Sequence, residues 1–353
     1  SQLRVARALR KEIGHGRDCP FARFIFMNSG SEAVTVAARI ADVNAKLMTD
    51  PGGRHAGKRP QKVAISGGFH GRTDRAARYS DSTRLNYEKH LASYQKNELW
   101  TVAPNDSDAL RELFARAERE NVFIEALFME PVMGEGNPGY ATSAEFYSLA
   151  RELTRQHGTL LLIDSIQAGL RAQGCLSIVD YPGFEKLDAP DFETYSKALN
   201  GGQYPLSVLA LTEEAALLYR KGIYGNTMTS NPRAMDVACA VLEAVTPELR
   251  ANIRDRGHEF LEKLTALQKE LDGPITGVQG TGLLFSCELA DGYKAYGEGS
   301  IEETMRMAGV SVIHGGENSL RYTPWFGITS AEVDLIVDAT RAALVGESVP
   351  VER

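Results

Sequence analysis

From residue 24 to residue 245, short apolar runs alternate with longer segments in which apolar positions recur every three or four residues. The runs are rich in β-branched residues and end in polar or glycine-rich turns, as buried strands do. With their turns, they span residues 24–33, 62–73, 124–136, 159–169, 190–199 and 206–212. The periodic segments predict amphipathic helices at residues 31–48, 106–121, 143–158 and 231–245. Strands that alternate with helices predict an α/β domain with a mostly parallel sheet.

A different pattern begins near Pro247. A long amphipathic helix is predicted at residues 248–271, and shorter strands and helices follow it. Strands are predicted at 277–289, 310–316 and 319–325, and helices around 300–309 and at 330–347. We therefore expect a large domain at residues 1–248 and a smaller α+β domain at 249–353. The chain starts with Ser1 and enters a helix-like segment at once, so we expect that an N-terminal portion is missing.

The composition argues against a nucleic-acid-binding protein, a disulfide-rich or zinc-binding protein and a membrane protein. The 353 residues are 43% hydrophobic and 24% charged with a formal net charge of −7, and no Lys/Arg-rich tract marks a nucleic-acid surface. The cysteines are too far apart for a zinc site or a disulfide framework, which fits a reducing, cytoplasmic compartment. They are Cys19, Cys175, Cys239 and Cys287. No apolar run reaches the roughly 20 residues of a membrane helix.

Polar clusters follow the predicted strands, where ligands bind in α/β sheets. In NSGSEA (28–33), free amides at a helix N-terminus favour a phosphate; the alternative is an ordinary N-cap made by Ser31, with Glu32 in the first turn. In LLLID, Asp164 ends an apolar run and needs a partner, either a protonated heterocyclic nitrogen or an internal arginine or helix N-terminus. Gln167 lies within reach of the same ligand.

Two further segments complete the candidate chemistry. In GGFHGRT (67–73), Phe69 offers a face for a flat ring and Arg72 a fork for a carboxylate; alternatively, Phe69 is buried and Arg72 solvated. Lys197 lies between a predicted strand and a glycine pair, Gly201 and Gly202, which would let the chain turn closely beneath a cofactor. A phosphate site, a ring stacker, an acid and a lysine are together what a pyridoxal phosphate enzyme requires.

In order and spacing, these motifs resemble those of the class III (ω-amino acid type) pyridoxal phosphate aminotransferases of fold type I. Ornithine, acetylornithine, GABA and lysine ω-aminotransferases belong to this family. The resemblance runs from Phe24 to about Ala343. It implies a mostly parallel central sheet with helices on both faces, a smaller C-terminal domain, and transfer of an amino group to a 2-oxo acid in a ping-pong reaction.

The resemblance also assigns cofactor contacts. SGSEA matches the phosphate loop, with Ser29, Gly30 and Ser31, and FHGRT matches the ring-stacking segment, with Phe69 and His70. Glu130 of MEPVMGEG would fall near the phenolic side of the cofactor.

DSIQAGL and YSKALNGG supply the remaining groups. The resemblance makes Asp164 the partner of the pyridine nitrogen, Gln167 the partner of the ring hydroxyl and Lys197 the Schiff-base lysine. Thr227 of YGNTMTSNP would reach the phosphate of a neighbouring subunit's cofactor, which implies a homodimer with shared sites.

Substrate contacts follow in the same way. Arg72 matches an arginine that grips a substrate carboxylate. Glu135 matches a glutamate that pairs with an arginine in ornithine-type enzymes, and Arg321 of SLRYTP matches that arginine. An intact pair would favour an ω-amino substrate, and an opened pair would expose Arg321 to glutamate or 2-oxoglutarate.

The sequence departs from the family pattern at two places. Ser165 stands where the family usually has Glu, and we expect its side chain to point away from the cofactor. Tyr224 replaces a common His, and Thr229–Ser230 replaces a glycine pair. Two alternatives to an aminotransferase remain at this stage: other pyridoxal phosphate chemistry on the same fold, such as an aminomutase, epimerase or decarboxylating transaminase, and a catalytically idle homologue.

Overall fold

The computed structural model describes residues 1–15, 18–94, 96 and 98–347. The chain forms two compact units. The first contains Ser1–Pro131, Thr142–Gly169 and Cys175–Ala244. The second contains Val132–Ala141, Leu170–Gly174 and the described residues from Val245 onward. Two short segments from the earlier part of the chain thus pack with the C-terminal part.

The first unit is built on a seven-stranded sheet in the order β1-β7-β6-β5-β4-β2-β3. β7 is antiparallel to both of its neighbours, and the other adjacent strands are parallel. All strands but β7 therefore end at the same edge. The strands are β1 (Arg23–Met27), β2 (Arg59–Ile65), β3 (Leu99–Val102), β4 (Val122–Met129), β5 (Leu160–Asp164), β6 (Phe192–Tyr195) and β7 (Ser207–Leu211).

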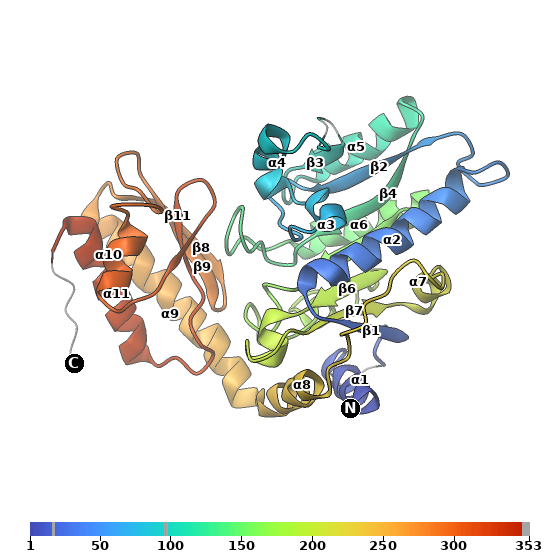
Figure 1. Cartoon of the computed structure of the whole chain (residues 1–353). Helices are drawn as coiled ribbons and strands as arrows, with labels where there is room; N and C mark the ends of the chain where they lie inside the picture. Colours follow the sequence, from blue (N-terminus) through green and yellow to red (C-terminus); the bar gives the residue numbers. More distant parts are fainter. Residues whose placement is uncertain (16–17, 95, 97, 348–353) are drawn as a thin grey trace. The chain divides into compact units, whose positions relative to one another are not determined.

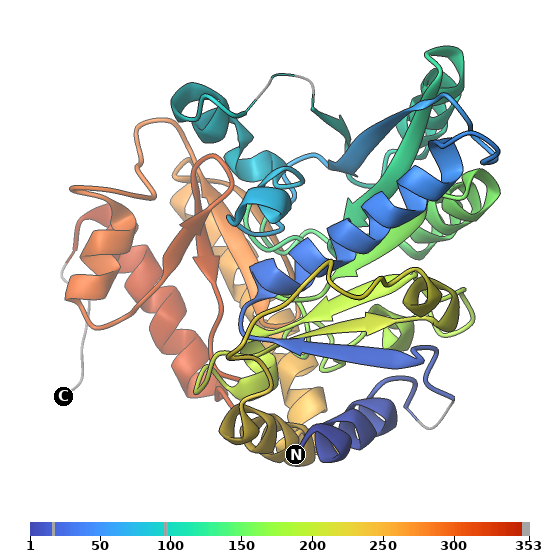
Figure 2. The ribbon, with the colours of Figure 1, turned by 45° about the vertical axis from the view of Figure 1, so that its right-hand side comes forward.

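Helices cover this sheet, as Figures 1 and 2 show. The apolar face of α2 packs on alternate residues of the strands, including Phe128 and Leu162, while α5 and α6 pack against β4 and β5. The expected fold class is confirmed: a mixed α/β chain with a mostly parallel sheet. The helices are α1 (Gln2–Glu12), α2 (Gly30–Thr49), α3 (Asp74–Ala77), α4 (Arg84–His90), α5 (Ser107–Arg119), α6 (Ala144–His157), α7 (Glu213–Leu217) and α8 (Pro232–Ala244).

The second unit has a four-stranded antiparallel sheet in the order β10-β11-β9-β8. Its core gathers Phe260 of the long helix α9 and Phe285 of the sheet, with ring centroids 4.3 Å apart. The elements are α9 (Pro247–Leu271), β8 (Ile275–Thr281), β9 (Leu284–Leu289), α10 (Ile301–Met307), β10 (Ile313–Gly315), β11 (Ser319–Tyr322) and α11 (Ser330–Val345).

Two sequence predictions fail here. The single strand expected at 277–289 is a hairpin, because the chain reverses at Gly282, which has a φ of 55°. A Cβ at Gly282 would lie 2.0 Å from the Ala172 carbonyl oxygen, so only glycine fits this turn. The edge strand β3 was not predicted, because its four residues, LWTV, are too few to show a period.

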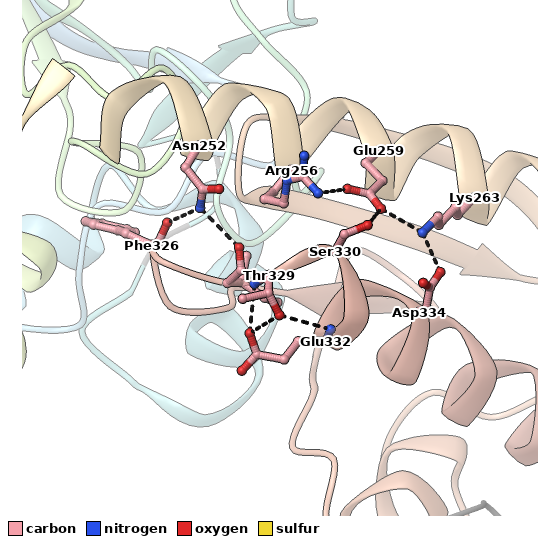
Figure 3. Close-up of polar contacts among 10 residues, drawn as sticks. Asn252, Arg256, Glu259, Lys263, Phe326, Thr329, Ser330, Glu332 and Asp334 are labelled. Atoms are coloured by element: carbon pink, nitrogen blue, oxygen red, sulfur yellow. Dashed lines mark hydrogen bonds and ion pairs between the residues drawn. The ribbon is translucent and has the colours of Figure 1, made fainter. Parts of the chain in front are cut away.

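Hydrogen bonds and ion pairs join α9 to residues 326–334 of the second unit (Figure 3). Lys263 binds Glu259, at 2.6 Å, and Asp334 of α11. Asn252 donates to the carbonyl oxygens of Phe326 and Ile328 at 2.8 and 3.1 Å. The network thereby holds the loop that follows β11 and leads into α11.

Candidate active site

A cavity of about 230 Å³ opens in the first unit at the edge where the parallel strands end. Eight of the residues predicted from the sequence line it, and they come from the ends of four strands. They are Gly30, Ser31, Phe69, His70, Arg72, Asp164, Gln167 and Lys197. Gly71, Ile166 and Ser196 also line the cavity and were not predicted, because none of them carries a charged or ring-stacking group.

The N-terminus of α2 forms one wall of the cavity. Its N-cap is Ser29 rather than Ser31: the Ser29 hydroxyl accepts from the Glu32 amide, and the Glu32 carboxylate accepts from the Ser29 amide at 2.9 Å. Ser31 instead lies 2.7 Å from the Thr73 hydroxyl and accepts from the Thr73 amide. The helix therefore begins at Gly30, one residue before the predicted start at residue 31, and its N-cap lies two residues before Ser31. Ser31 connects the helix to the loop after β2.

Two glycines keep space open beside this helix end. A Cβ at Gly30 would lie 2.5 Å from Ile166 Cδ1, and one at Gly71 would lie 2.3 Å from Ser31 Oγ. Gly71 also has a φ of 110°, which side chains other than glycine rarely adopt. A close approach of backbone amides to an anion requires such small residues.

Asp164 ends β5 and is buried, with three partners. Its Oδ2 lies 2.9 Å from His70 Nδ1, and its Oδ1 accepts from the Thr194 hydroxyl at 3.1 Å and from the Ile166 amide at 3.2 Å. None of these three partners is an arginine, which was one alternative predicted for Asp164 from the sequence. His70 is itself buried, and its Nε2 has no hydrogen-bond partner among the described residues.

Ser165 directly follows β5, and its side chain contacts β6 instead of lining the cavity. Its hydroxyl donates to Glu193 Oε1 at 2.6 Å, and Glu193 also accepts from the Ser177 hydroxyl at 2.5 Å and the Ile178 amide at 2.9 Å. Glu193 is completely buried in β6. Burial raises the pKa of its carboxyl to about 7, and the three hydrogen bonds offset this only in part. A carboxyl in β6 thus holds the segment that carries Asp164 and Gln167.

We expect the Glu193 carboxyl to make folding stability depend on pH. Between 4.5, its ordinary pKa, and about 7, the folded protein keeps a proton that the unfolded chain has released. Stability therefore falls as pH rises through this window, by ~3 kcal/mol in total. In Glu193→Gln, Oε1 can still accept two bonds and Nε2 can donate to Ser177, so the variant should lose this slope and be the more stable protein at pH 8.

Urea unfolding of the holoenzyme at pH 5, 6, 7 and 8 measures the effect. Glu152→Gln, at an exposed position on α6, is the control and should keep the wild-type slope. Equal slopes for wild type and Glu193→Gln would contradict the prediction.

Lys197 follows β6 and opens a short 3₁₀ helix, Lys197–Asn200. Its φ is 41°, a left-handed conformation that costs a non-glycine residue about 1 kcal/mol or more. Ser196 anchors the chain just before it by donating to the Leu206 carbonyl oxygen at 2.6 Å. Gly201 and Gly202 have φ values of 58° and 71°, and a Cβ at Gly202 would meet nothing within 4 Å. Both conformations are left-handed, which glycine adopts without strain.

Phe69 and Arg72 lie together in the cavity wall. The Arg72 guanidinium carbon is 5.7 Å from the centroid of the Phe69 ring. The Phe69 amide donates to Glu130 Oε1 at 3.0 Å, so Glu130 holds the loop of the expected stacking residue and does not itself line the cavity. Thr227 is also outside the cavity, on an exposed loop before α8.

The expected substrate pair, Glu135 and Arg321, belongs to the second unit. The Arg321 guanidinium, on β11, donates to the Gly134 carbonyl oxygen, and the Gly316 amide donates to the Glu135 carbonyl oxygen at 2.6 Å. A Cβ at Gly315 would lie 3.1 Å from the Glu135 carbonyl oxygen and 3.6 Å from Arg321 Cδ. The structure therefore brings the 134–135 segment and Arg321 to the same place within this unit.

The residues of the cavity fit pyridoxal 5′-phosphate. The glycine-lined end of α2 suits the phosphate, the buried Asp164 suits a protonated ring nitrogen, and Lys197 in the same cavity supplies the amine. The described residues contain no group of three or more acidic, His or Cys side chains that could hold a metal ion. In the described part of the chain, no helix is both long and apolar enough to cross a membrane.

Comparisons with known proteins agree with this geometry. A family model described as Aminotransferase class-III matches residues 1–344. Ornithine aminotransferase from Toxoplasma gondii ME49 is 22% identical with a TM-score of 0.80, over 97% of this chain and 76% of that chain. N-acetylornithine aminotransferase from Stenotrophomonas maltophilia K279a is 24% identical with a TM-score of 0.74, over 98% of this chain and 79% of that chain.

A third structure is an amine transaminase from an uncultivated Pseudomonas species in its PLP-bound form. It is 24% identical with a TM-score of 0.80, over 97% of this chain and 81% of that chain. At these identities, the three structures show a common fold, and the family model adds a match along nearly the whole sequence. The protein therefore belongs to the class-III aminotransferases, enzymes of fold type I that depend on pyridoxal 5′-phosphate.

Proposed function

We propose that this aminotransferase moves a terminal (ω-) amino group of an amino acid or related amine to a 2-oxo acid such as 2-oxoglutarate. The observation that carries the site assignment is the convergence of Lys197, Asp164 and the N-terminus of α2 on one cavity. The substrate class is supported by Arg72 in that cavity and by Arg321 beside the 134–135 segment in the second unit. Similar folds named as ornithine and N-acetylornithine aminotransferases support it further.

In this proposal, each residue has a definite task. When bound, the cofactor supplies an electrophilic carbonyl carbon and an electron-withdrawing ring. Lys197 would hold the cofactor through its side-chain amine, and the same amine would move a proton to and from the substrate carbon that carries the amino group. Asp164, oriented by His70, Thr194 and the Ile166 amide, would face the ring nitrogen of the cofactor.

Binding and orientation fall to the other residues of the cavity. The amides at the start of α2 would hold the phosphate, because a helix N-terminus has free N–H groups and its dipole favours negative charge. Phe69 would pack on the ring of the cofactor, and Gln167 would contact its hydroxyl. Arg72 holds a substrate carboxylate through its two parallel N–H groups.

We expect Glu135 to set the preference between ω-amino and α-amino substrates. Without its carboxylate, Arg321 would be free to bind the carboxylate of an α-amino acid. Glu135→Ala should therefore shift the ratio of kcat/KM values for glutamate over an ω-amino donor by about tenfold, the equivalent of ~1.4 kcal/mol. Glu317→Ala, at an exposed position between β10 and β11, is the control. An unchanged ratio in Glu135→Ala would remove the basis for dual specificity.

A screen of amino donors tests the reaction itself. Purified holoenzyme is supplied with ω-amino acids, α-amino acids or simple amines, and with 2-oxoglutarate or pyruvate as acceptor. The proposal expects repeated turnover of an ω-amine to carbonyl product only when the 2-oxo acid is present, and at most one equivalent of product per site without it. Repeated turnover without an acceptor would contradict amino transfer, and product from α-amino acids alone would contradict the proposed substrate class.

We also propose a cytoplasmic homodimer with shared sites. The support is the exposed loop of Thr227, which lies outside its own chain's cavity, and four cysteines that form no disulfide. A monomer that stays active at high dilution would contradict the dimer.

A further inference from the structure

The loop that carries Thr227 is attached to the N-terminus of α2 through a single carboxylate, that of Glu32. The loop, residues 224–231, is mostly exposed and contains Tyr224 and Thr229–Ser230, one of the two places at which this sequence departs from the family pattern. We infer that Asn226, with Tyr224 and Glu32, is a positioning residue that presents Thr227 to the cofactor phosphate of a second copy of this chain. These three residues are called the loop anchor below. The inference rests on the proposed homodimer and on phosphate binding at α2.

The two oxygens of Glu32 have different partners. Oε2 accepts from the backbone amides of Asn28 and Ser29, both at 2.9 Å, and so completes the N-cap of α2. Oε1 accepts from Asn226 Nδ2 at 2.6 Å and from the Tyr224 hydroxyl at 3.3 Å. The same carboxylate therefore orders the proposed phosphate-binding end of the helix and holds the loop.

Asn226 also gives the loop its local shape. Its Oδ1 accepts from the Met228 amide at 3.1 Å, and its backbone carbonyl oxygen accepts from the Thr229 hydroxyl, also at 3.1 Å. Thr227 lies between these contacts, inside an Asx-turn. The side chain of Asn226 thus shapes the turn with one atom and attaches it to α2 with the other.

Few other contacts compete with the anchor. Met228 is 76% exposed, and the backbone at Ile223 is held by Arg39, which also belongs to α2. Burial opposes ionisation of Glu32, but hydrogen bonds from Asn226, the Asn28 and Ser29 amides and Tyr224 outweigh it and lower its pKa. At neutral pH the anchor is therefore built on an anion, and hydrogen bonds to an anion are roughly twice as strong as neutral ones.

In a dimer, this arrangement would connect the phosphate sites of the two copies. The start of α2 would hold the phosphate in one copy's own cavity, and Thr227, attached to that helix start, would contact the phosphate in the other copy. Loss of the anchor should then weaken the dimer and release the cofactor more quickly, while each chain remains folded.

Variants that exchange the hydrogen-bond donor and acceptor between Asn226 and Glu32 test the anchor. Asn226→Asp keeps the acceptor for the Met228 amide but places a second carboxylate against Glu32. Glu32→Gln keeps the N-cap, since glutamine also serves at this position, but places an amide donor against Asn226 Nδ2. In the double variant, the glutamine introduced on α2 can donate to the aspartate introduced in the loop, and the contact is restored with reversed polarity.

We expect each single variant to raise the dimer dissociation constant about tenfold and to speed release of pyridoxal phosphate about tenfold. The double variant should return both to within about threefold of wild type, as coupled neighbours do. Sedimentation over a dilution series gives the first quantity, and cofactor fluorescence after transfer to apo-acceptor gives the second. Circular dichroism confirms folding, and Lys221→Ala, exposed in the same stretch, is the control.

Each outcome decides the question. Rescue in the double variant supports the anchor, because a general loss of folding would not be repaired by a second substitution. A cofactor-bound wild-type dimer with unchanged single variants, or with an unrescued double variant, overturns the anchor and leaves the proposed function standing. A wild type that is an active monomer overturns the anchor and the proposed homodimer, and leaves the proposed amino transfer standing.

Discussion

Lys197→Ala is expected to reduce amino transfer by at least a thousandfold, because one nitrogen atom has two tasks. General acid–base catalysis alone contributes about 10²–10⁴-fold. Loss of the covalent bond to the cofactor adds to this, since Lys197 is the amine that lines the cavity, at the end of β6. Alanine carries the same Cβ as lysine, so the left-handed backbone at this position costs both residues about the same and the fold should survive the substitution.

Borohydride reduction followed by peptide mass spectrometry provides the measurement. Wild-type protein should retain the cofactor on the peptide that contains Lys197, and Lys197→Ala should retain none. Lys186→Ala, at an exposed position in the same unit, should behave as wild type in both labelling and turnover. Cofactor trapped on a different lysine, or turnover within tenfold of wild type, would contradict the assignment.

Asp164→Asn should give the second largest effect, a fall in kcat of about 10²–10³-fold, as when one preorganised electrostatic contact at a reacting group is removed. The substitution preserves shape: an amide oxygen can still accept from the Ile166 amide and the Thr194 hydroxyl, while the amide group faces His70. The fold and the phosphate contacts should therefore survive. What is lost is the negative charge beside the ring nitrogen.

Single-turnover kinetics with a saturating amino donor separate this loss from weaker binding. Thr194→Val removes one hydrogen bond to Asp164 but keeps the charge, so its kcat should fall less than tenfold. The cofactor absorbance of Asp164→Asn should also change, whereas that of Thr194→Val should not. Equal effects of the two variants would show that Asp164 acts through packing rather than charge.

Several features of the fold were predictable because they are local. The apolar runs that became β4 and β5 are buried along their whole lengths, and a continuous apolar run predicts such a strand. Asp164 ends one such run and Lys197 follows the shorter strand β6, so parallel strands had to bring both to one edge of the sheet. The order of the short motifs then indicated the cofactor and the family.

Other features depended on contacts between distant parts of the chain. One partner of Asp164 is His70, 94 positions away, and Ser165 donates to Glu193, 28 positions away on the next strand. No spacing rule identifies such pairs, because they are set by strand register and by the path of the loop after β2. For the same reason, the contact between the Glu130 carboxylate and the Phe69 amide, 61 positions apart, could not be predicted.

By itself, the sequence determined the α/β class, the strand ends that carry Asp164 and Lys197, and the family, because burial patterns and motifs depend on residues that are close together in the sequence. Only the tertiary structure decided which atoms those groups meet. It placed Ser29 rather than Ser31 at the N-cap of α2 and joined Asn226 to Glu32 across 194 positions of the chain. The physical reason is that a hydrogen bond depends on distance and direction in space, and folding brings together residues whose separation along the chain carries no signal.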